Sequence, residues 1–201
     1  MYYFATLRSC RHPGCANAAL HASEHCAAHL EEPKAYRERI AEMVVHGGRL
    51  LEKVNLEGAD LRGIAIPLAK LAESNLSGAL LEGADLEGAD LRRVMAFRAN
   101  LRGANLRGAR CDLAVLGGAI LDGAVCDGAV FKRANLVGAS AVGASFRQCD
   151  FYYSRPGNAD FSRADLSGAV IQRAIFRAAD LRGAILTGVR GTANFERAKQ
   201  G

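Results

Sequence analysis

The chain of 201 residues contains no apolar stretch long enough to cross a membrane, because glycine and charged residues interrupt its apolar runs. Its first eight residues also lack the extended apolar core that is typical of a secretion signal. These two absences exclude a transmembrane protein and predict a protein of the cytoplasm.

Histidine is missing altogether from residues 51–201. The same region shows neither a glycine-rich loop of the kind that cradles phosphate nor a nucleophile placed beside a candidate base. Its Asp and Asn residues, such as Asp85 and Asn100, recur at one position of a repeat and do not form a catalytic pair. We therefore expect a protein that is not an enzyme.

A strong excess of either charge is also absent. The formal net charge is +5, and residues 51–201 contain 20 Lys or Arg against 16 Asp or Glu. A nucleic-acid-binding domain usually has a larger basic excess, so binding of nucleic acid is not expected. The charge is nevertheless uneven along the chain, since residues 91–110 contain six Arg and no acidic residue.

What the sequence does have is a five-residue repeat that keeps its phase from residue 54 to residue 188. Stepping from Leu56 to Leu186 gives 27 units, and the central residue is Leu, Ile or Phe in 22 of them. Ala stands two positions before the centre in 21 units, and Gly stands two positions after it in 15. A short fixed period indicates a solenoid whose successive turns bury one another's apolar faces.

A period of five fits neither a helix nor a straight strand, whose side chains return to one face every 3.6 and every 2 residues. Each unit is therefore interpreted as a short extended edge followed by a corner. Glycine suits the corner because it accepts backbone conformations that are closed to other residues. The large central residue fills the interior, and the small Ala lets the backbone pass close to the axis.

Residues 59–63, 104–108 and 164–168 read Ala-(Asp/Asn)-Leu-x-Gly. This signature resembles that of the pentapeptide-repeat family, and the resemblance covers about two thirds of the chain. It implies an all-β fold, a right-handed quadrilateral β-helix with four units in each coil and nearly seven coils. The period alone would also allow three units in each coil. At about 4.8 Å between stacked strands, the rod would be about 32 Å long.

Some pentapeptide-repeat proteins protect or inhibit DNA gyrase by presenting a strongly acidic rod that resembles DNA. This chain lacks that acidity, so a role directed at gyrase or topoisomerase is an alternative and not the first expectation. The first expectation is a non-catalytic protein-interaction or scaffold module with a protein partner. A nucleic-acid binder is a further alternative.

Two places depart from the repeat. Pro156 stands at a central position, and the stretch of residues 152–158 is interpreted as a small outward bulge. After Leu186 the register slips by one residue within residues 191–195, which predicts that the solenoid frays near its end.

Residues 1–30 contain three of the six cysteines and four of the five histidines. Cys10 and Cys15 flank a turn-forming segment that can bring two thiolates together. Cys26 and His29 are three residues apart, which places them on one face of a helical turn. Four such ligands suit tetrahedral Zn²⁺ with no open position, so the metal would be structural. The pattern resembles small Cys-Cys-Cys-His zinc knuckles of the treble-clef type.

Three other histidines are alternatives to His29 as the fourth ligand: His12, His21 and His25. The alternative to zinc is a set of free or disulfide-bonded thiols, although three cysteines cannot all pair among themselves and a cytoplasmic setting disfavours disulfides. The remaining cysteines occupy inward positions of the repeat and are interpreted as small buried hydrophobic residues: Cys111, Cys126 and Cys149.

Residues 31–46 have a helical pattern, with Pro33 in the first turn and Gly47-Gly48 as a stop. An apolar stripe on this helix is expected to cover the first coil near Leu51: Tyr36, Ile40, Met43 and Val44. The sequence therefore predicts a zinc-knuckle-like segment over 1–30, a capping helix with linker over 31–50, and the β-helix over 51–201.

If each coil takes 20 residues, positions 20 apart stack on one face of the rod. One such column combines basic residues with two tyrosines and forms a candidate interaction strip: Arg92, Arg93, Lys132, Arg133, Tyr152, Tyr153 and Arg173. This strip would suit an acidic partner or a nucleic-acid backbone. The alternative interpretation is an ordinary solvated face.

Overall fold

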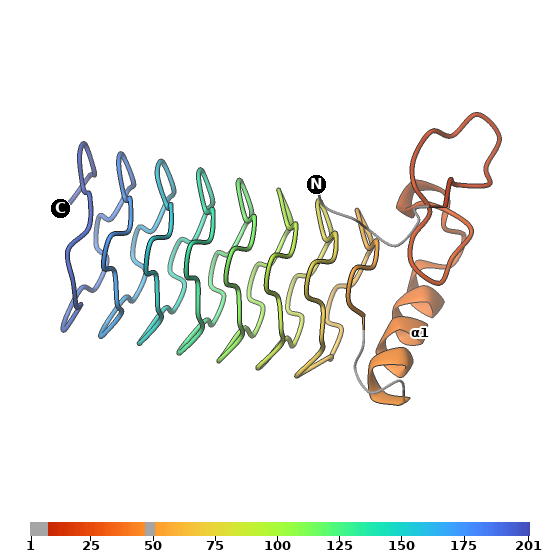
Figure 1. Ribbon diagram of the computed structural model, residues 1–201, viewed down its shortest axis with the longest axis horizontal. Helices are drawn as coiled ribbons and strands as arrows, with labels where there is room; N and C mark the ends of the chain where they lie inside the picture. Colours follow the sequence, from red (N-terminus) through yellow and green to blue (C-terminus); the bar gives the residue numbers. More distant parts are fainter. Residues whose placement is uncertain (1–7, 47–50) are drawn as a thin grey trace.

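The computed structural model describes residues 8–46 and 51–201. It consists of a loop-rich N-terminal segment, a short 3-10 helix η1 (Ala27–His29), an α-helix α1 (Pro33–His46) and a long coiled rod. The rod occupies residues 51–201, and the N-terminal segment lies at one of its ends (Figure 1). Among the described residues, no helix is long and apolar enough to span a membrane.

Each coil of the rod contains four five-residue units. Parallel bridges join a residue to the one 20 positions later, from Asn55 and Asn75 at the front to Val170 and Arg190 near the far end. The N–H groups of most central residues support this ladder, as when Leu56 donates to the Asn75 carbonyl at 2.7 Å. The fold is a right-handed quadrilateral β-helix. The bridges therefore confirm four units in each coil, which the period alone did not decide.

The interior of the rod is almost entirely apolar as far as Leu181, with Leu56, Leu86 and Ala104 each 0% exposed. Ser74 and Ser154 are buried polar residues in the Ala layer, and the last central residue, Leu186, is exposed. Aromatic rings replace leucine in the later coils and pack edge-to-face or stacked, with Phe131 and Phe151 5.3 Å apart between ring centroids. The three rod cysteines are buried as expected, and burial raises the pKa of each thiol. They fill the core as small hydrophobic residues.

The corner of each unit is a left-handed turn. The residue two positions after the centre has a positive φ whether or not it is glycine, as in Gly63 (62°) and Arg93 (55°). Glycine adopts this conformation freely, whereas a residue with a Cβ adopts it at a cost of about 1–2 kcal/mol. The sequence predicts the glycine corners, but it does not predict that other residues form the same turn.

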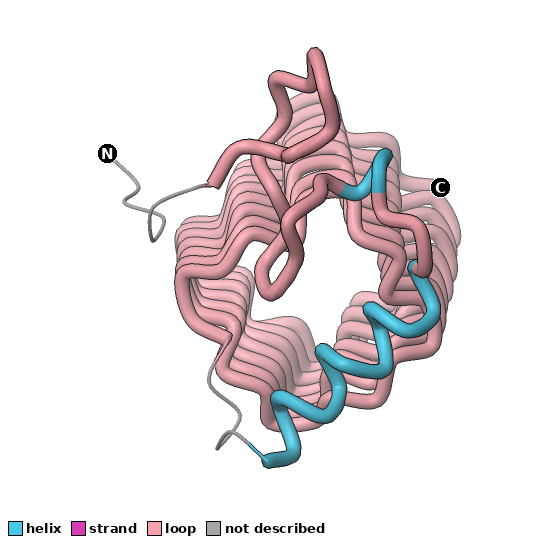
Figure 2. The backbone as a smooth tube through the Cα atoms, turned by 90° about the vertical axis from the view of Figure 1, so that its right-hand side faces the viewer, coloured by secondary structure: helices cyan, strands magenta, loops and turns pink. Residues whose placement is uncertain are grey.

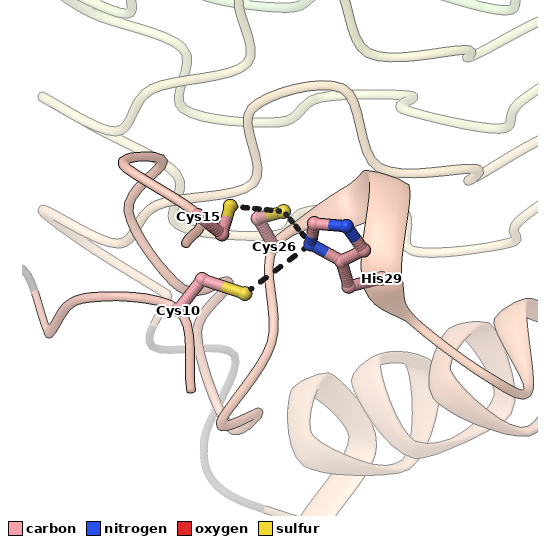
Figure 3. A group of neighbouring side chains, drawn as sticks. All are labelled: Cys10, Cys15, Cys26 and His29. Carbon is pink, nitrogen blue, oxygen red and sulfur yellow. Dashed lines mark hydrogen bonds between the residues drawn. The ribbon is translucent and has the colours of Figure 1, made fainter. Parts of the chain in front are cut away.

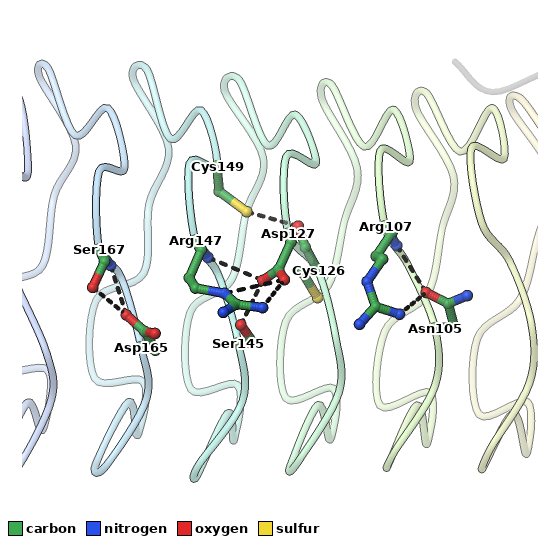
Figure 4. A network of polar contacts seen from close by, with 9 residues as sticks. All are labelled: Asn105, Arg107, Cys126, Asp127, Ser145, Arg147, Cys149, Asp165 and Ser167. Atoms are coloured by element: carbon green, nitrogen blue, oxygen red, sulfur yellow. Dashed lines mark hydrogen bonds and ion pairs between the residues drawn. The ribbon is translucent and has the colours of Figure 1, made fainter.

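The recurring Asp and Asn residues stabilise these corners. Their side-chain oxygen accepts the N–H two residues on, as in Arg107 N–H to Asn105 Oδ1 at 3.2 Å (Figure 4). Arg side chains at the turns also reach carboxylates one coil away, as in the 2.6 Å pair of Arg147 with Asp127 (Figure 4). Such Asx turns explain why the repeat prefers Asp or Asn before the centre.

Two of these carboxyls have strongly lowered pKa values. The pKa of Asp60 and Asp180 falls to about 2, first because the side chains of Arg62 and Arg182 donate hydrogen bonds to them. A carboxyl whose folded-state pKa lies below its unfolded value of about 3.9 stabilises the fold above that pH. That stabilisation is lost as the pH falls towards the folded-state value.

We therefore expect the melting temperature to fall as the pH is lowered from about 4 to about 2, and to fall less in an Asp60→Asn/Asp180→Asn variant. Asn keeps the turn, since Asn100 and Asn105 make the same bond to the N–H two residues on. Thermal unfolding followed by circular dichroism across this range checks the expectation. Equal pH slopes for the two proteins would contradict it.

The stretch around Pro156 does not bulge, so that interpretation is wrong. Pro156 is buried at its central position, and the turns on either side keep the regular pattern. Proline has no N–H to donate to the next coil. Accordingly the bridge expected between Arg155 and Ile175 is absent from the otherwise continuous ladder of the described rod. The rod loses one bond there and not its register.

The register slip near the end is confirmed, but the coil continues beyond it. Ile175 bridges to Asn194 and Asp180 to Lys199, a separation of 19 residues in place of 20. The last coil is therefore one residue shorter than the others, and its bridges to the preceding coil continue. The expected fraying is therefore not found.

Helix α1 lies across the front end of the rod (Figure 2). It begins at Pro33, two residues after the expected start. Tyr36, Ile40 and Val44 are almost fully buried in the same cluster as Leu51, and Met43 packs against that cluster. The helix thus covers apolar surface that the first coil would otherwise expose. The expected stop at Gly47-Gly48 lies outside the described residues.

Candidate metal centre and the outward faces of the rod

The N-terminal segment brings Cys10 and Cys15 together through a tight turn. A bridge pairs Ser9 with Ala18, and the N–H of Cys10 donates to the Asn17 carbonyl at 2.9 Å. The N–H of Cys15 donates to the His12 carbonyl at 3.1 Å, with Gly14 between them at a φ of 75°. The turn-forming residues between the two cysteines therefore have the geometry that the sequence suggested.

The second pair lies on η1. Cys26 immediately precedes this helix and His29 ends it, and the N–H of His29 donates to the Cys26 carbonyl at 3.0 Å. The three-residue spacing therefore corresponds to a 3-10 turn. It points both side chains at the first pair of cysteines (Figure 3).

One ligand atom from each of Cys10, Cys15, Cys26 and His29 lies within 4.8 Å of all the others. The sulfurs of Cys15 and Cys26 are 3.8 Å apart, and Nδ1 of His29 lies 3.5 Å from the Cys10 sulfur and 3.4 Å from the Cys26 sulfur. A tetrahedral zinc ion bound at about 2.3 Å by sulfur and 2.0–2.1 Å by nitrogen would separate its ligands by about 3.6–3.8 Å. These four residues could therefore hold a metal ion.

The other histidines take different positions. His12 stacks on the His29 ring at 3.8 Å between centroids, and its Nδ1 lies 3.1 Å from the Pro13 carbonyl oxygen. His21 and His25 are not part of the four-residue group. Asn17 Nδ2 lies 3.8 Å from the Cys26 sulfur, as a donor that favours a thiolate would. Among the four histidines of residues 8–30, His29 is thus the one grouped with the three sulfurs.

Sequence reasoning missed the residue that joins this segment to the rod. The buried side chain of Asn55 donates to the Ala19 carbonyl at 2.9 Å, and the backbone carbonyl of Asn55 accepts the N–H of His21 at 2.7 Å. The Tyr36 hydroxyl donates to the His21 carbonyl at 2.8 Å. Asn55 is one of many Asn residues before a centre, so nothing in the repeat distinguishes it.

All seven residues of the candidate interaction strip lie at turns of one face of the rod, but they do not form one continuous contact. Three are neutralised by neighbours: Arg92 by Asp90 at 2.5 Å, Arg93 by Glu73 at 3.6 Å, and Lys132 by Asp150 at 3.2 Å. Asp112 and Leu113 separate the first two from the rest.

The structure brings the remaining strip residues together around Tyr153. The guanidinium carbons of Arg133 and Arg173 lie 6.0 and 5.1 Å from the centre of its ring, and Arg173 also donates a hydrogen bond to its hydroxyl. Tyr152 packs against Tyr153 in a T-shaped arrangement at 4.7 Å. This arrangement is a cation–π cluster on an exposed surface.

Comparison with known proteins places the repeat in a family. The model for pentapeptide repeats matches eight copies, over residues 74–110, 109–148, 130–155 and 157–190. No protein of curated function matches the chain.

Several solved structures are similar to the rod. HetL, a pentapeptide repeat protein involved in heterocyst differentiation regulation in the cyanobacterium Nostoc, is 31% identical over 72% of this chain and 71% of its own, with a TM-score of 0.39. A pentapeptide repeat protein of the Arabidopsis thaliana thylakoid lumen is 28% identical over 48% of this chain and 61% of its own, with a TM-score of 0.35.

QnrB1, a plasmid-mediated fluoroquinolone resistance protein, is 21% identical over 73% of this chain and 77% of its own, with a TM-score of 0.44. The family match alone covers more than half of the chain, and it coincides with the region in which bridges recur every 20 residues. The chain belongs to the pentapeptide-repeat family.

Proposed function

We propose that the chain is a non-catalytic protein-interaction module, a rigid rod whose N-terminal end is held by a structural metal ion. One observation carries this proposal. The interior is closed and almost entirely apolar, and successive coils repeat their outward positions in register up to the slip near the end, so binding to the rod must use the side chains of its four flat faces. Such a rod holds its outward groups at fixed spacings without loss of conformational freedom on binding.

The metal in this proposal is Zn²⁺, bound by Cys10, Cys15, Cys26 and His29. Three sulfurs and one imidazole nitrogen are a ligand set typical of closed, structural zinc sites. A bound ion would fix the turn at Gly14 and η1 relative to one another. The hydrogen bonds of Asn55 would pass that rigidity to the first coil. In this division residues 1–30 form the zinc segment, residues 31–50 form the helix that caps the rod and the linker to it, and residues 51–201 form the binding rod.

Charge supports a protein partner over the alternatives. Over residues 51–190 the outward positions of the four faces carry net charges of +4, +2, −1 and −2. The most acidic face has a net charge of only −2, far below the strong negative charge of a rod that resembles DNA, and this weighs against a gyrase-directed role. The most basic face contains nine basic and five acidic residues, and this mixture weighs against binding a continuous phosphate backbone.

The test is affinity capture from a lysate of the source organism at physiological salt, with the Leu101→Asp variant described below as a misfolded control. We expect a protein to be retained by the folded chain and not by the Leu101→Asp control. We also expect this protein to bind the purified chain with a defined stoichiometry in calorimetry. Recovery of nucleic acid only, or of nothing beyond the control, would overturn the proposal. Recovery of gyrase subunits would establish the gyrase-directed alternative in its place.

A further inference from the structure

One face of the rod differs from the other three at its corners. We call it the arginine face and define it by its seven left-handed turn residues, one per coil: Lys53, Glu73, Arg93, Leu113, Arg133, Tyr153 and Arg173. Their φ values lie between 55° and 61°. None of the seven is glycine, whereas 15 of the 21 equivalent positions on the other faces are.

This concentration of side chains is not required by the fold. Glycine fits the same turn on the two neighbouring faces, as at Gly108 and Gly118, one unit before and one unit after Leu113. A left-handed backbone is unfavourable for any residue with a Cβ and most unusual for a bulky one such as Tyr153. The arginine face therefore retains seven side chains against the local backbone preference, which indicates a role outside folding.

The basic residues of this face recur in every second coil, at Lys53, Arg93, Arg133 and Arg173. Since coils are spaced by about 4.8 Å, these charges repeat at about 10 Å along the rod. Lys53 and Arg93 share Glu73, at 3.9 and 3.6 Å. Within the described residues, Arg133 and Arg173 have no carboxylate in ion-pair range, and both are exposed. The tyrosine between them holds the two guanidinium groups in place without neutralising them.

We propose that the arginine face binds an acidic helix of a protein partner, laid along the rod with a carboxylate at every seventh residue. Seven residues of α-helix rise about 10.5 Å, which matches the spacing of two coils. Arginine pairs with carboxylates in a forked geometry that two fixed guanidinium groups can offer at once. The inference rests on the proposed function, because it names the face and the partner chemistry of the same interaction module.

The other side chains of the face favour a protein over a nucleic acid. Leu113 is 40% exposed and Tyr153 37% exposed, which provides apolar contact between the charges. Glu73, Asp112 and Asp150 lie on the same face and would repel the unbroken charge of a phosphate backbone. A helix with carboxylates separated by neutral residues can avoid these acidic groups.

The probe is a fluorescent alanine-rich helical peptide with three Glu spaced seven residues apart, compared with a peptide of identical composition whose Glu are spaced five apart. The second spacing distributes the carboxylates around the helix, so total charge is constant and only the alignment changes. By fluorescence anisotropy we expect the peptide with Glu seven residues apart to bind about tenfold more tightly. The peptide with Glu five residues apart cannot place two carboxylates on the arginine face at once and so loses paired charge-assisted contacts. A DNA duplex of similar length serves as a third probe.

The variant that tests the site is Arg133→Gly/Arg173→Gly, and its matched control is Arg98→Gly/Arg163→Gly. Arg98 and Arg163 occupy the same left-handed turn position on two other faces. Both variants remove two positive charges and replace a strained residue by glycine, so neither melting temperature should fall. We expect the first variant to lose the preference for the aligned peptide and the second to keep it.

Equal binding of the two peptides to the wild type, equal losses in the two variants, or a preference for the DNA duplex would each overturn the inference. A partner found by capture separates this failure from that of the proposed function. If such a partner binds Arg133→Gly/Arg173→Gly as tightly as the wild type, the arginine face is wrong and the interaction module stands. If no protein partner is captured, both fall.

Discussion

Replacing Leu101 by Asp is expected to unfold the rod. Leu101 is a central residue, 4% exposed, and its side chain lies among the buried residues of neighbouring coils. The substitution removes the apolar contacts of a leucine and places an unpaired charge in the interior, for a combined loss of more than about 4 kcal/mol. Circular dichroism and urea titration of the purified variant measure the loss.

The matched control is Leu113→Asp. Leu113 is 40% exposed at a left-handed turn, a conformation that Asp tolerates better than Leu. The same chemical change should therefore shift stability by no more than about 0.5 kcal/mol. A Leu101→Asp protein that melts cooperatively at the wild-type temperature would contradict the inward assignment of the central residues.

Replacing Cys15 by Ser is expected to abolish stoichiometric zinc binding. The variant leaves three ligands, and loss of a structural zinc ion removes free energy that otherwise stabilises the folded segment. Because each coil contacts only its neighbours, the effect should be concentrated at the front of the rod. Elemental analysis after dialysis against a weak chelator and hydrogen exchange of the amides around Asn55 report the two parts of this expectation.

Cys111→Ala is the control for the metal experiment, since it removes a thiol that is buried far along the rod. It should keep one equivalent of zinc. The opposite pattern, with full zinc in Cys15→Ser, would show that the four ligands are assigned wrongly. A wild-type chain that contains no zinc would contradict a structural metal altogether.

Much of the fold was predictable from sequence because its determinants are local and repeated. The Leu and Ala layers and the glycine corners each follow from residues within one unit. The grouping of Cys10 and Cys15 likewise depends on a short turn whose residues indicate its shape. The stripe of Tyr36, Ile40 and Val44 follows from helical periodicity in the same way.

The remaining features depend on contacts between units, which the pattern does not encode. Four units per coil is set by hydrogen bonds between residues 20 apart. The stretch around Pro156 was interpreted as a bulge because proline stands at a central position of the repeat. The neighbouring coils, which the pattern within one unit does not describe, hold the backbone in register there. The bonds of Asn55 to the N-terminal segment and the ring contacts of Tyr153 with two arginines are equally non-local.

The most direct measurement is the affinity of the captured partner for the wild type and for a variant with Arg93, Arg133 and Arg173 all changed to Glu. We expect a protein partner whose dissociation constant rises at least about tenfold in the variant, because reversed charges on one face repel what that face attracts. An unchanged dissociation constant would contradict binding through the arginine face. The absence of any protein partner would contradict the interaction module itself.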